Sequence, residues 1–183
     1  MTRCEVTIVH IDDEPSMLSA LRRSLTRSWP ASDGILRLHS CVSPSVALDT
    51  LLVDPVDVVI SDYRMPEMDG VELLRRVRER QPHAGRVLLS GTAERSFLRS
   101  AVNHAAVARV LRKPWRDDDL LEAVRHCVEL RRLQMENAQL SDQVSAQCRQ
   151  LSQQEGSLRH YRELHSAGAA LSFPSDHPDQ ELS

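Results

Sequence analysis

The sequence predicts an α/β fold in which a five-stranded parallel sheet is doubly wound, with helices on both faces. Five short apolar runs, most of them rich in β-branched residues, alternate over the first 128 or so residues with stretches whose apolar residues recur at helical spacing. Parallel strands require right-handed crossovers, and a helix after each strand supplies them. The predicted strands are 6–11, 35–38, 56–60, 86–89 and 108–111.

The first two strand–helix units carry recognisable helix starts. Pro15 follows strand 6–11 at a position suited to a first helical turn. The apolar residues of this first helix are Met17, Leu18, Leu21 and Leu25. After the shorter, more marginal strand 35–38, Ser43 suits an N-cap and Pro44 the first helical position. The second helix then includes Val46, Ala47, Leu48, Leu51 and Leu52.

The next three units repeat the alternation. Strand 56–60 precedes a loop that contains Met65-Pro66 and Asp69-Gly70, and the third helix ends at Pro82. The apolar residues of that helix are Val71, Leu73, Leu74 and Val77. Strand 86–89 precedes a fourth helix with Phe97, Leu98, Ala101, Val102 and Ala105. Strand 108–111 precedes a fifth helix that begins near Asp117.

The fifth helix is predicted to continue beyond the α/β domain as a dimeric coiled coil. A heptad register places Leu130, Asn137, Val144, Leu151 and Leu158 at a, and Leu133, Leu140, Gln147, Gln154 and Tyr161 at d. Pairing would cover this apolar stripe, and Asn137 at a favours a parallel two-stranded coil. The glutamines at d and Gly156 favour the alternative, which is a single solvated helix or a partly disordered segment.

These patterns divide the chain into three parts. Residues 1–128 form the α/β domain, 129–165 the helical extension continuous with the fifth helix, and 166–183 a tail that lacks any period. We expect that tail to be disordered.

Composition excludes several classes of function. The formal net charge of -3 gives no general attraction to nucleic acid. The N-terminus does not have the pattern of a signal peptide, and no apolar run is long enough to span a membrane. The four cysteines are scattered without a CxxC pair, as in a protein with reduced thiols. We therefore expect a cytoplasmic protein without a membrane partner.

Chemically active side chains follow four of the predicted strands. Each type alone has an ordinary explanation, since paired aspartates cap helices and serines form turns. Ligands of a parallel sheet, however, collect at the carboxyl ends of its strands, so these groups should converge. Clustered carboxylates repel one another, and Mg²⁺ would resolve that conflict beside a phosphate. The residues are Asp12, Asp13, Asp62, Ser90 and Lys113, the only lysine in the sequence.

Four segments carry a resemblance to a known family. They read IDDEP, ISDYRMPEMDG, VLLSGTA and LRKPW, in that order. The chain resembles a bacterial response-regulator receiver domain of the chemotaxis-regulator type over roughly residues 5–128. The resemblance implies a flavodoxin-like sheet of strand order 2-1-3-4-5 and a cis peptide bond between Lys113 and Pro114.

The resemblance also implies a role for each site residue. Asp62 would be the phosphoacceptor, and Ser90 and Lys113 would hold phosphoryl oxygens. Asp13, Asp62 and the backbone carbonyl of Arg64 would bind Mg²⁺ directly. Asp12 would act largely through metal-bound water.

Two positions bear on how such a domain would switch. Receivers that switch through a rotating aromatic carry Tyr or Phe where this chain has Val110, which puts that coupling in doubt. Arg64 stands two residues after the phosphoacceptor, where we expect it to affect dephosphorylation.

The leading functional hypothesis is a two-component response regulator. A sensor histidine kinase or phosphotransfer protein would donate the phosphoryl group to Asp62. The chain would signal as a homodimer to a downstream protein target, without binding DNA and without acting as an enzyme on other substrates. The sequences KPW and DDDLLEAV resemble those of receivers that precede cyclic-dinucleotide phosphodiesterase domains or hydrogenase-type transcription regulators. Cyclic-dinucleotide signalling is therefore one candidate pathway.

Three other hypotheses remain at this stage. The chain could be a constitutive coiled-coil adaptor whose receiver is a docking module. It could be a magnesium-dependent phosphohydrolase, although Asp62-Tyr63-Arg64 lacks the second Asp of a DxD motif. It could bind DNA through the fifth helix, although its arginines there are few and interleaved with Gln and Glu: Arg131, Arg132 and Arg149.

Overall fold

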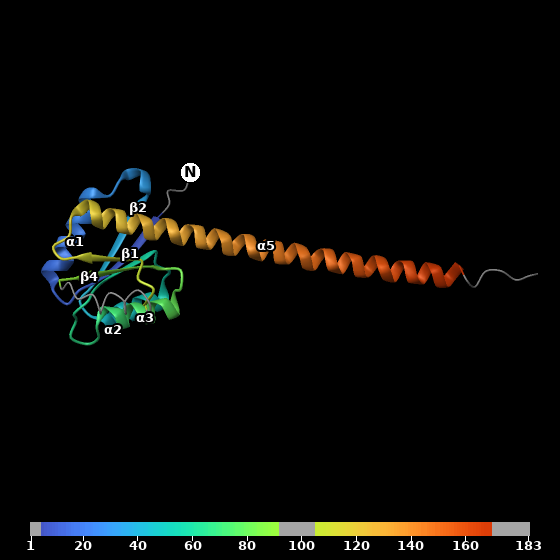
Figure 1. Cartoon of the computed structure of the whole chain (residues 1–183), viewed down its shortest axis with the longest axis horizontal. Helices are drawn as coiled ribbons and strands as arrows, with labels where there is room; N and C mark the ends of the chain where they lie inside the picture. Colours follow the sequence, from blue (N-terminus) through green and yellow to red (C-terminus); the bar gives the residue numbers. More distant parts are fainter. Residues whose placement is uncertain (1–4, 92–104, 170–183) are drawn as a thin grey trace, which may run out of the picture. The chain divides into compact units, whose positions relative to one another are not determined.

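The computed structural model describes residues 5–91 and 105–169. These residues form two compact units, Met1–Glu136 and Asn137–Ser183 by their outer bounds. The first unit contains the sheet and its helices, and the second contains the distal part of one long helix, α5 (Asp117–Ala169). Figure 1 shows the order of the elements along the chain.

The first unit is built on a five-stranded, all-parallel sheet of order β2-β1-β3-β4-β5. This confirms the predicted doubly wound α/β fold and its strand order. The strands are β1 (Glu5–Ile11), β2 (Ile35–Cys41), β3 (Val58–Asp62), β4 (Gly85–Ser90) and β5 (Arg109–Arg112).

Helices cover both faces of this sheet. The described helices are α1 (Pro15–Ser28), η1 (Ala31–Asp33), α2 (Pro44–Val53), α3 (Gly70–Arg80) and α5. One apolar core joins the sheet to α2 and α3, and includes Val9, Val59, Leu73 and Leu74. The other joins it to α1 and α5, and includes Ile8, Ile60, Leu25 and Leu120. Figure 1 shows α2 and α3 on the opposite side of the sheet from α1.

The boundaries of several elements differ from the predicted ones. The third strand was predicted at 56–60, but β3 starts at Val58 and ends at Asp62 itself. The reason lies in pairing, because β3 is bonded to β1 on one side and to β4 on the other over this stretch. Asp62 is therefore fixed by the ladder of a central strand rather than carried on a loop. The predicted fourth helix, Phe97 to Ala105, falls almost entirely outside the described residues.

Polar contacts tie α5 to the rest of the first unit at three points. Asp117 accepts hydrogen bonds from Ser24 and Arg27 of α1. Arg125 lies 2.8 Å from Asp33 of η1. Arg131 Nη1 lies 2.5 Å from Asp57 Oδ1, just before β3. The proximal part of α5 is thus held along the sheet by charge as well as by its apolar face.

The apolar residues of α5 are buried in its first part and exposed in the rest. Leu120, Ala123, Val124 and Cys127 are buried. From Leu130 onward the large apolar side chains of α5 are exposed: Leu130, Leu133, Met135, Leu140, Val144, Leu151 and Leu158. The helix extends four residues past the predicted end at His165. Among the described residues no helix is long and apolar enough to cross a membrane.

Candidate functional site

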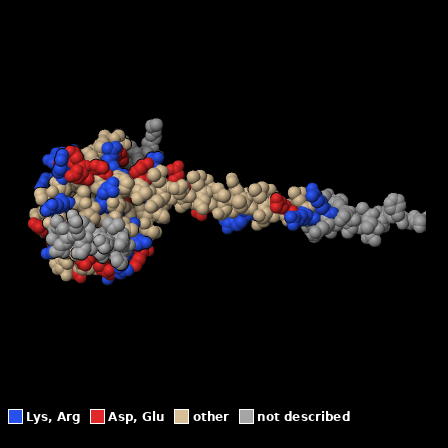
Figure 2. All heavy atoms as spheres, in the orientation of Figure 1, with Lys and Arg blue, Asp and Glu red and all other residues tan. Residues whose placement is uncertain are grey.

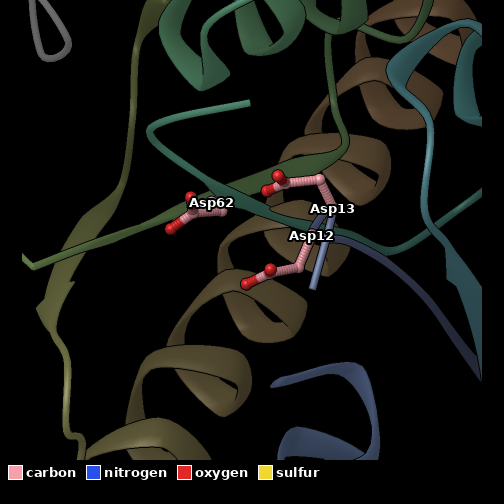
Figure 3. A group of neighbouring side chains, drawn as sticks. All are labelled: Asp12, Asp13 and Asp62. Atoms are coloured by element: carbon pink, nitrogen blue, oxygen red, sulfur yellow. The ribbon is translucent and has the colours of Figure 1, made fainter. Parts of the chain in front are cut away.

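Three aspartates meet at the carboxyl edge of the sheet. Asp12 and Asp13 follow β1, and Asp62 is the last residue of the neighbouring strand β3. One carboxylate oxygen from each lies within 4.8 Å of those of the other two. Figure 3 shows the three side chains converging from the two strands. Asp12 and Asp62 are buried and Asp13 is exposed, so the cluster opens to solvent on one side.

The only lysine of the sequence joins this cluster. Lys113 Nζ lies 2.6 Å from Asp62 Oδ1 and 2.7 Å from Asp12 Oδ2. Its position is set by the backbone, because Lys113 N donates to Ser90 O at 2.9 Å. The Lys113–Pro114 peptide bond is cis, which confirms the expectation drawn from the resemblance. The side chain thus reaches from the end of the edge strand β5 to carboxylates on β1 and β3.

Backbone N–H groups hold the second oxygen of each buried carboxylate. Glu14 N donates to Asp12 Oδ1 at 2.9 Å, and Arg64 N donates to Asp62 Oδ2 at 3.0 Å. Each carboxylate is therefore oriented by an ammonium on one oxygen and an amide on the other. Charge-assisted bonds of this kind fix direction as well as position.

Ser90 lies at the same edge. It is the last residue of β4 and is buried, with 3% of its surface exposed. Its neighbour Leu89 pairs with Asp62 across the β3–β4 ladder, which places Ser90 level with the loop that follows Asp62. All five residues predicted to converge therefore lie at one edge of the sheet, and Arg64 lies beside them with its side chain exposed.

Burial and charge act in opposite directions on the pKa values of Asp12 and Lys113. Burial raises the pKa of Asp12, and the hydrogen bonds from Lys113 and Glu14 offset only part of that effect. Burial alone would lower the pKa of Lys113, but Asp12 and Asp62 outweigh it and raise the pKa above its usual value. Lys113 therefore stays an ammonium, in an environment where two nearby carboxylates favour its charge.

The oxygen donors at this edge fit a hard divalent cation. Three carboxylates face a single ammonium, so negative charge exceeds positive charge among the groups that meet there. Mg²⁺ prefers oxygen ligands and is commonly bound by one or two carboxylates. The residues that could hold it are Asp12, Asp13 and Asp62.

Gly70 is a positioning residue that the sequence analysis left inside a loop. A Cβ atom on Gly70 would lie 2.1 Å from the backbone oxygen of Asp62 and 2.8 Å from Leu88 Cδ1. The first residue of α3 thus presses directly on the strand end that carries Asp62. Asp69 caps this helix by accepting from Glu72 N at 2.8 Å. The sequence Met68-Asp69-Gly70 was the available signal for this residue. The requirement for glycine follows only from its tertiary contact with Asp62.

His10 is a second residue near the site that sequence reasoning did not single out. It lies on β1 and is fully buried. Neither ring nitrogen has a hydrogen-bond partner among the described residues. Burial, followed by the charges of Lys113 and Arg22, lowers the pKa of His10 to about 3. The imidazole is therefore neutral at physiological pH and adds no charge to the site.

Comparison with known proteins agrees with this geometry. The model of the family described as "Response regulator receiver domain" matches residues 8–125. The chain belongs to the response regulator receiver family. Its membership accounts for the sheet order and for the placing of acids and lysine at one edge.

Curated relatives are longer regulators. The chain is 34% identical over 173 residues to the hydrogenase transcriptional regulatory protein HoxA of Cupriavidus necator, covering 94% of this chain and 33% of HoxA. It is 34% identical over 137 residues to the C4-dicarboxylate transport transcriptional regulatory protein DctD of Pseudomonas aeruginosa, covering 74% of this chain and 28% of DctD. The chain thus spans about a third of the length of these relatives.

The chain is also similar to a solved receiver domain. The signal receiver domain of an HD domain-containing protein from Pseudomonas fluorescens Pf-5 is 30% identical, with a TM-score of 0.62. The match covers 70% of this chain and 98% of that one. The likeness therefore includes nearly all of a receiver domain.

Proposed function

We propose that the chain is a response regulator that accepts a phosphoryl group on Asp62. The donor would be a phosphohistidine of a sensor histidine kinase or a phosphotransfer protein. The observation that carries this proposal is the pairing of the Asp62 carboxylate with Lys113 at 2.6 Å, inside a cluster of three aspartates. A nucleophilic carboxylate must stay ionised, and the negative charge of the incoming phosphoryl group must be balanced. The groups at this edge of the sheet would meet both requirements.

In the proposed reaction a carboxylate oxygen of Asp62 attacks phosphorus while the bond from phosphorus to the donor's imidazole nitrogen breaks. The product is an acyl phosphate, and the electron pair of the broken bond stays on the imidazole. Lys113 Nζ would move its hydrogen bond from the carboxylate to a phosphoryl oxygen, and Ser90 would donate to another. The Arg64 N–H keeps the carboxylate oriented during the attack.

The site would hold Mg²⁺ through Asp13, Asp62 and the backbone carbonyl of Arg64, with Asp12 acting from the outer sphere. When bound, the cation supplies positive charge near the phosphoryl oxygens. We expect no turnover of other substrates, because Asp62-Tyr63-Arg64 lacks a second acid beside the nucleophile. Release of aryl alcohol from a generic aryl phosphate by the purified chain would contradict this part.

Mass spectrometry of the intact chain tests the acceptor. After incubation with acetyl phosphate and Mg²⁺, we expect a mass increase of one phosphoryl group, which Asp62→Asn abolishes and a chelator prevents. Asp49→Asn removes an exposed acid on α2 and serves as the matched control. An adduct of equal yield on Asp62→Asn would overturn the assignment.

We further propose that the chain signals as a homodimer paired through α5, by contacts with a downstream protein. The support is the set of exposed apolar residues on α5, all of which except Met135 fall on the a and d positions of one heptad register. Figure 2 shows largely uncharged surface along much of this helix. A partner in cyclic-dinucleotide signalling remains one candidate.

Light scattering tests the dimer. The wild type should have twice the monomer mass, and Leu133→Glu should reduce it to the monomer mass. Met135→Glu is the matched control, because Met135 is also exposed on α5 but falls at position f. A wild-type monomer, both with and without beryllofluoride, would remove the dimer from the proposal.

The named relatives are transcriptional regulators, so DNA binding is the natural rival for the output. A single helix with scattered arginines offers a small positive footprint, and the net charge of the chain is negative. We expect no salt-sensitive binding of the chain to duplex DNA in a titration between low and physiological salt. Binding that weakens steeply with salt would favour the rival.

A further inference from the structure

We propose that Arg86 is a positioning residue for Lys113. By holding the backbone turn at Ala106, the Arg86 guanidinium sets the register of β5, and with it the point at which the Lys113 ammonium meets Asp62. The inference rests on the proposed function only for its kinetic readout, because the position of Lys113 can be measured without phosphorylation.

The strand that carries Lys113 to the site has little of its own to fix its register. β5 is a four-residue edge strand that pairs only with β4, and none of its residues is fully buried. Register is strongly specified only where one face of a strand is buried. A slip of one residue would move Lys113 by about 3.3 Å along the strand and turn its side chain to the other face. The Lys113 contacts at 2.6 and 2.7 Å would then be lost.

Arg86, on β4, contacts the chain just before β5 through its main chain and its side chain. Ala108 N donates to Arg86 O at 2.8 Å, and Arg86 Nε donates to Ala106 O at 3.2 Å. At the other end of the strand, Lys113 N donates to Ser90 O at 2.9 Å. β5 is thus tied to β4 at both ends, and Arg86 supplies these contacts at the first end.

The guanidinium of Arg86 is itself fixed by the loop between α3 and β4. Arg86 Nη1 donates to Ala84 O at 2.7 Å and to Pro82 O at 3.2 Å. The residue is 9% exposed, and none of the ion pairs found among the described residues includes it. A buried cation is costly unless its donors are satisfied, and a rigid fork of N–H groups can serve several carbonyls at once. The arginine therefore joins two loops through their backbone oxygens.

The turn that Arg86 holds has an unfavourable backbone conformation. Ala106 has a φ of 46°, and within 5–91 and 105–169 it is the only residue other than glycine with a positive φ. Such a conformation costs free energy and persists where the surroundings hold it. Ala105 and Val107 are buried on either side, and Arg86 binds the carbonyl oxygen between them. Loss of this hydrogen bond should let the turn relax and β5 shift.

The competing interpretation is that Arg86 only stabilises the domain. Packing of Ala105 and Val107 would then fix the turn by itself, and loss of the guanidinium would lower the free energy of unfolding without moving Lys113. The position of Lys113 therefore separates the two interpretations.

NMR of the full chain enriched in ¹³C at lysine Cε measures that position, because the only lysine gives one Cε signal. In the wild-type background, Asp62→Asn removes a charged contact of Lys113, so the signal should shift. In Arg86→Met, the signal should move toward that of a solvent-exposed lysine, and adding Asp62→Asn should no longer shift it. A signal that keeps its wild-type position in Arg86→Met and still responds to Asp62→Asn would overturn the proposal.

Two control variants separate position from stability. Arg80→Met removes an arginine that donates to a backbone carbonyl of α2, Leu48 O at 3.2 Å, instead of one before β5. Ile8→Val shortens a fully buried side chain in the core beside α1 and α5. Both should leave the Lys113 signal in place. If Ile8→Val displaces the signal as Arg86→Met does, general destabilisation explains the effect and the proposal fails.

Phosphorylation kinetics give the second readout. With acetyl phosphate and Mg²⁺, the rate of Arg86→Met should approach the roughly 10- to 100-fold loss expected for Lys113→Met. The double variant should be no slower than Lys113→Met alone, because the effect of Arg86 passes through Lys113. Multiplying losses in the double variant would show that Arg86 acts elsewhere. If the wild type itself is not phosphorylated, the proposed function fails, while the Lys113 signal still decides this inference.

A milder substitution covers the case in which Arg86→Met does not fold. Arg86→Gln keeps one amide group where the guanidinium serves three carbonyls. It should displace the Lys113 signal in the same direction by a smaller amount. An unmoved signal in folded Arg86→Gln would then refute the positioning role.

Discussion

Lys113 Nζ lies 2.6 Å from Asp62 Oδ1, although the two residues are carried by strands that are not neighbours in the sheet. The edge strand β5 thus supplies the cation for a carboxylate on the central strand β3. The position of Lys113, at the end of β5, therefore depends on the charge of the Asp62 side chain.

Replacing Lys113 should therefore slow phosphorylation without unfolding the domain. Lys113→Met removes a charge-assisted hydrogen bond, a loss of about 1.5–3 kcal/mol, so the rate with acetyl phosphate should fall roughly 10- to 100-fold. Lys113→Arg should also be slow, because a planar guanidinium cannot replace a compact ammonium between two carboxylates. Intact-mass kinetics measure both. Arg112→Met, at the exposed neighbouring position, should match the wild type, and equal rates for all variants would contradict the role of Lys113.

Gly70→Ala should destabilise the receiver and disturb the acceptor at the same time. The new methyl group would lie 2.1 Å from Asp62 O, which is backbone and cannot rotate away. Overpacking of this kind costs roughly 1–3 kcal/mol, which urea unfolding would detect. Gly91→Ala is the matched control, because a Cβ there meets nothing within 4 Å. Equal unfolding midpoints for the two variants would show that α3 can shift without cost.

The Asp57–Arg131 pair should couple α5 to the sheet energetically. Both side chains are mostly buried, at 17% and 24% exposed, and Arg131 Nε is buried without a hydrogen-bond partner among the described residues. Asp57→Asn or Arg131→Met alone should lower the free energy of unfolding by about 1–3 kcal/mol, since each leaves a charge unpaired. The double variant should lose less than the sum, as a double-mutant cycle would measure. Arg132→Met, at the exposed neighbour, should have little effect, and a strictly additive cycle would contradict the coupling.

Cys127 should make the receiver less stable at alkaline pH. Burial raises the pKa of its thiol from 9.0 to about 11. The unfolded chain therefore releases this proton first as pH rises, so the stabilisation is complete below pH 9.0 and is lost between 9.0 and about 11. The stabilisation lost over this range is about 2–3 kcal/mol. Cys127→Ala should show a smaller decline in unfolding free energy over this range, and parallel curves for the two proteins would refute the assignment.

Much of the fold and the site could be predicted from the sequence because both depend on strand ends. Apolar runs locate the strands, and the polar residue that leaves each parallel strand falls at the shared edge. This pattern alone predicts that Asp12, Asp13, Asp62, Ser90 and Lys113 lie together. The cis bond after Lys113 came from the family resemblance rather than from the pattern.

Other features could not be predicted because they depend on contacts between distant segments. Nothing in the sequence shows that Gly70 touches the backbone of Asp62 or that Gly85 leaves room for Cys127. The Asp57–Arg131 pair joins residues 74 positions apart, and Arg131 was weighed only as a potential DNA contact. The start of β3 was predicted two residues early because Val56 is buried before the ladder begins.

Because the sequence contains a single lysine, one defined side chain can be labelled through its amine. Amine-specific reagents have one side-chain target here, and it is Lys113, with 19% of its side chain exposed. Two carboxylates hold it as an ammonium, which such reagents do not attack. Its labelling rate, corrected for the terminal amine, therefore reports how strongly the two carboxylates interact with the Lys113 ammonium. The measurement needs no engineered probe.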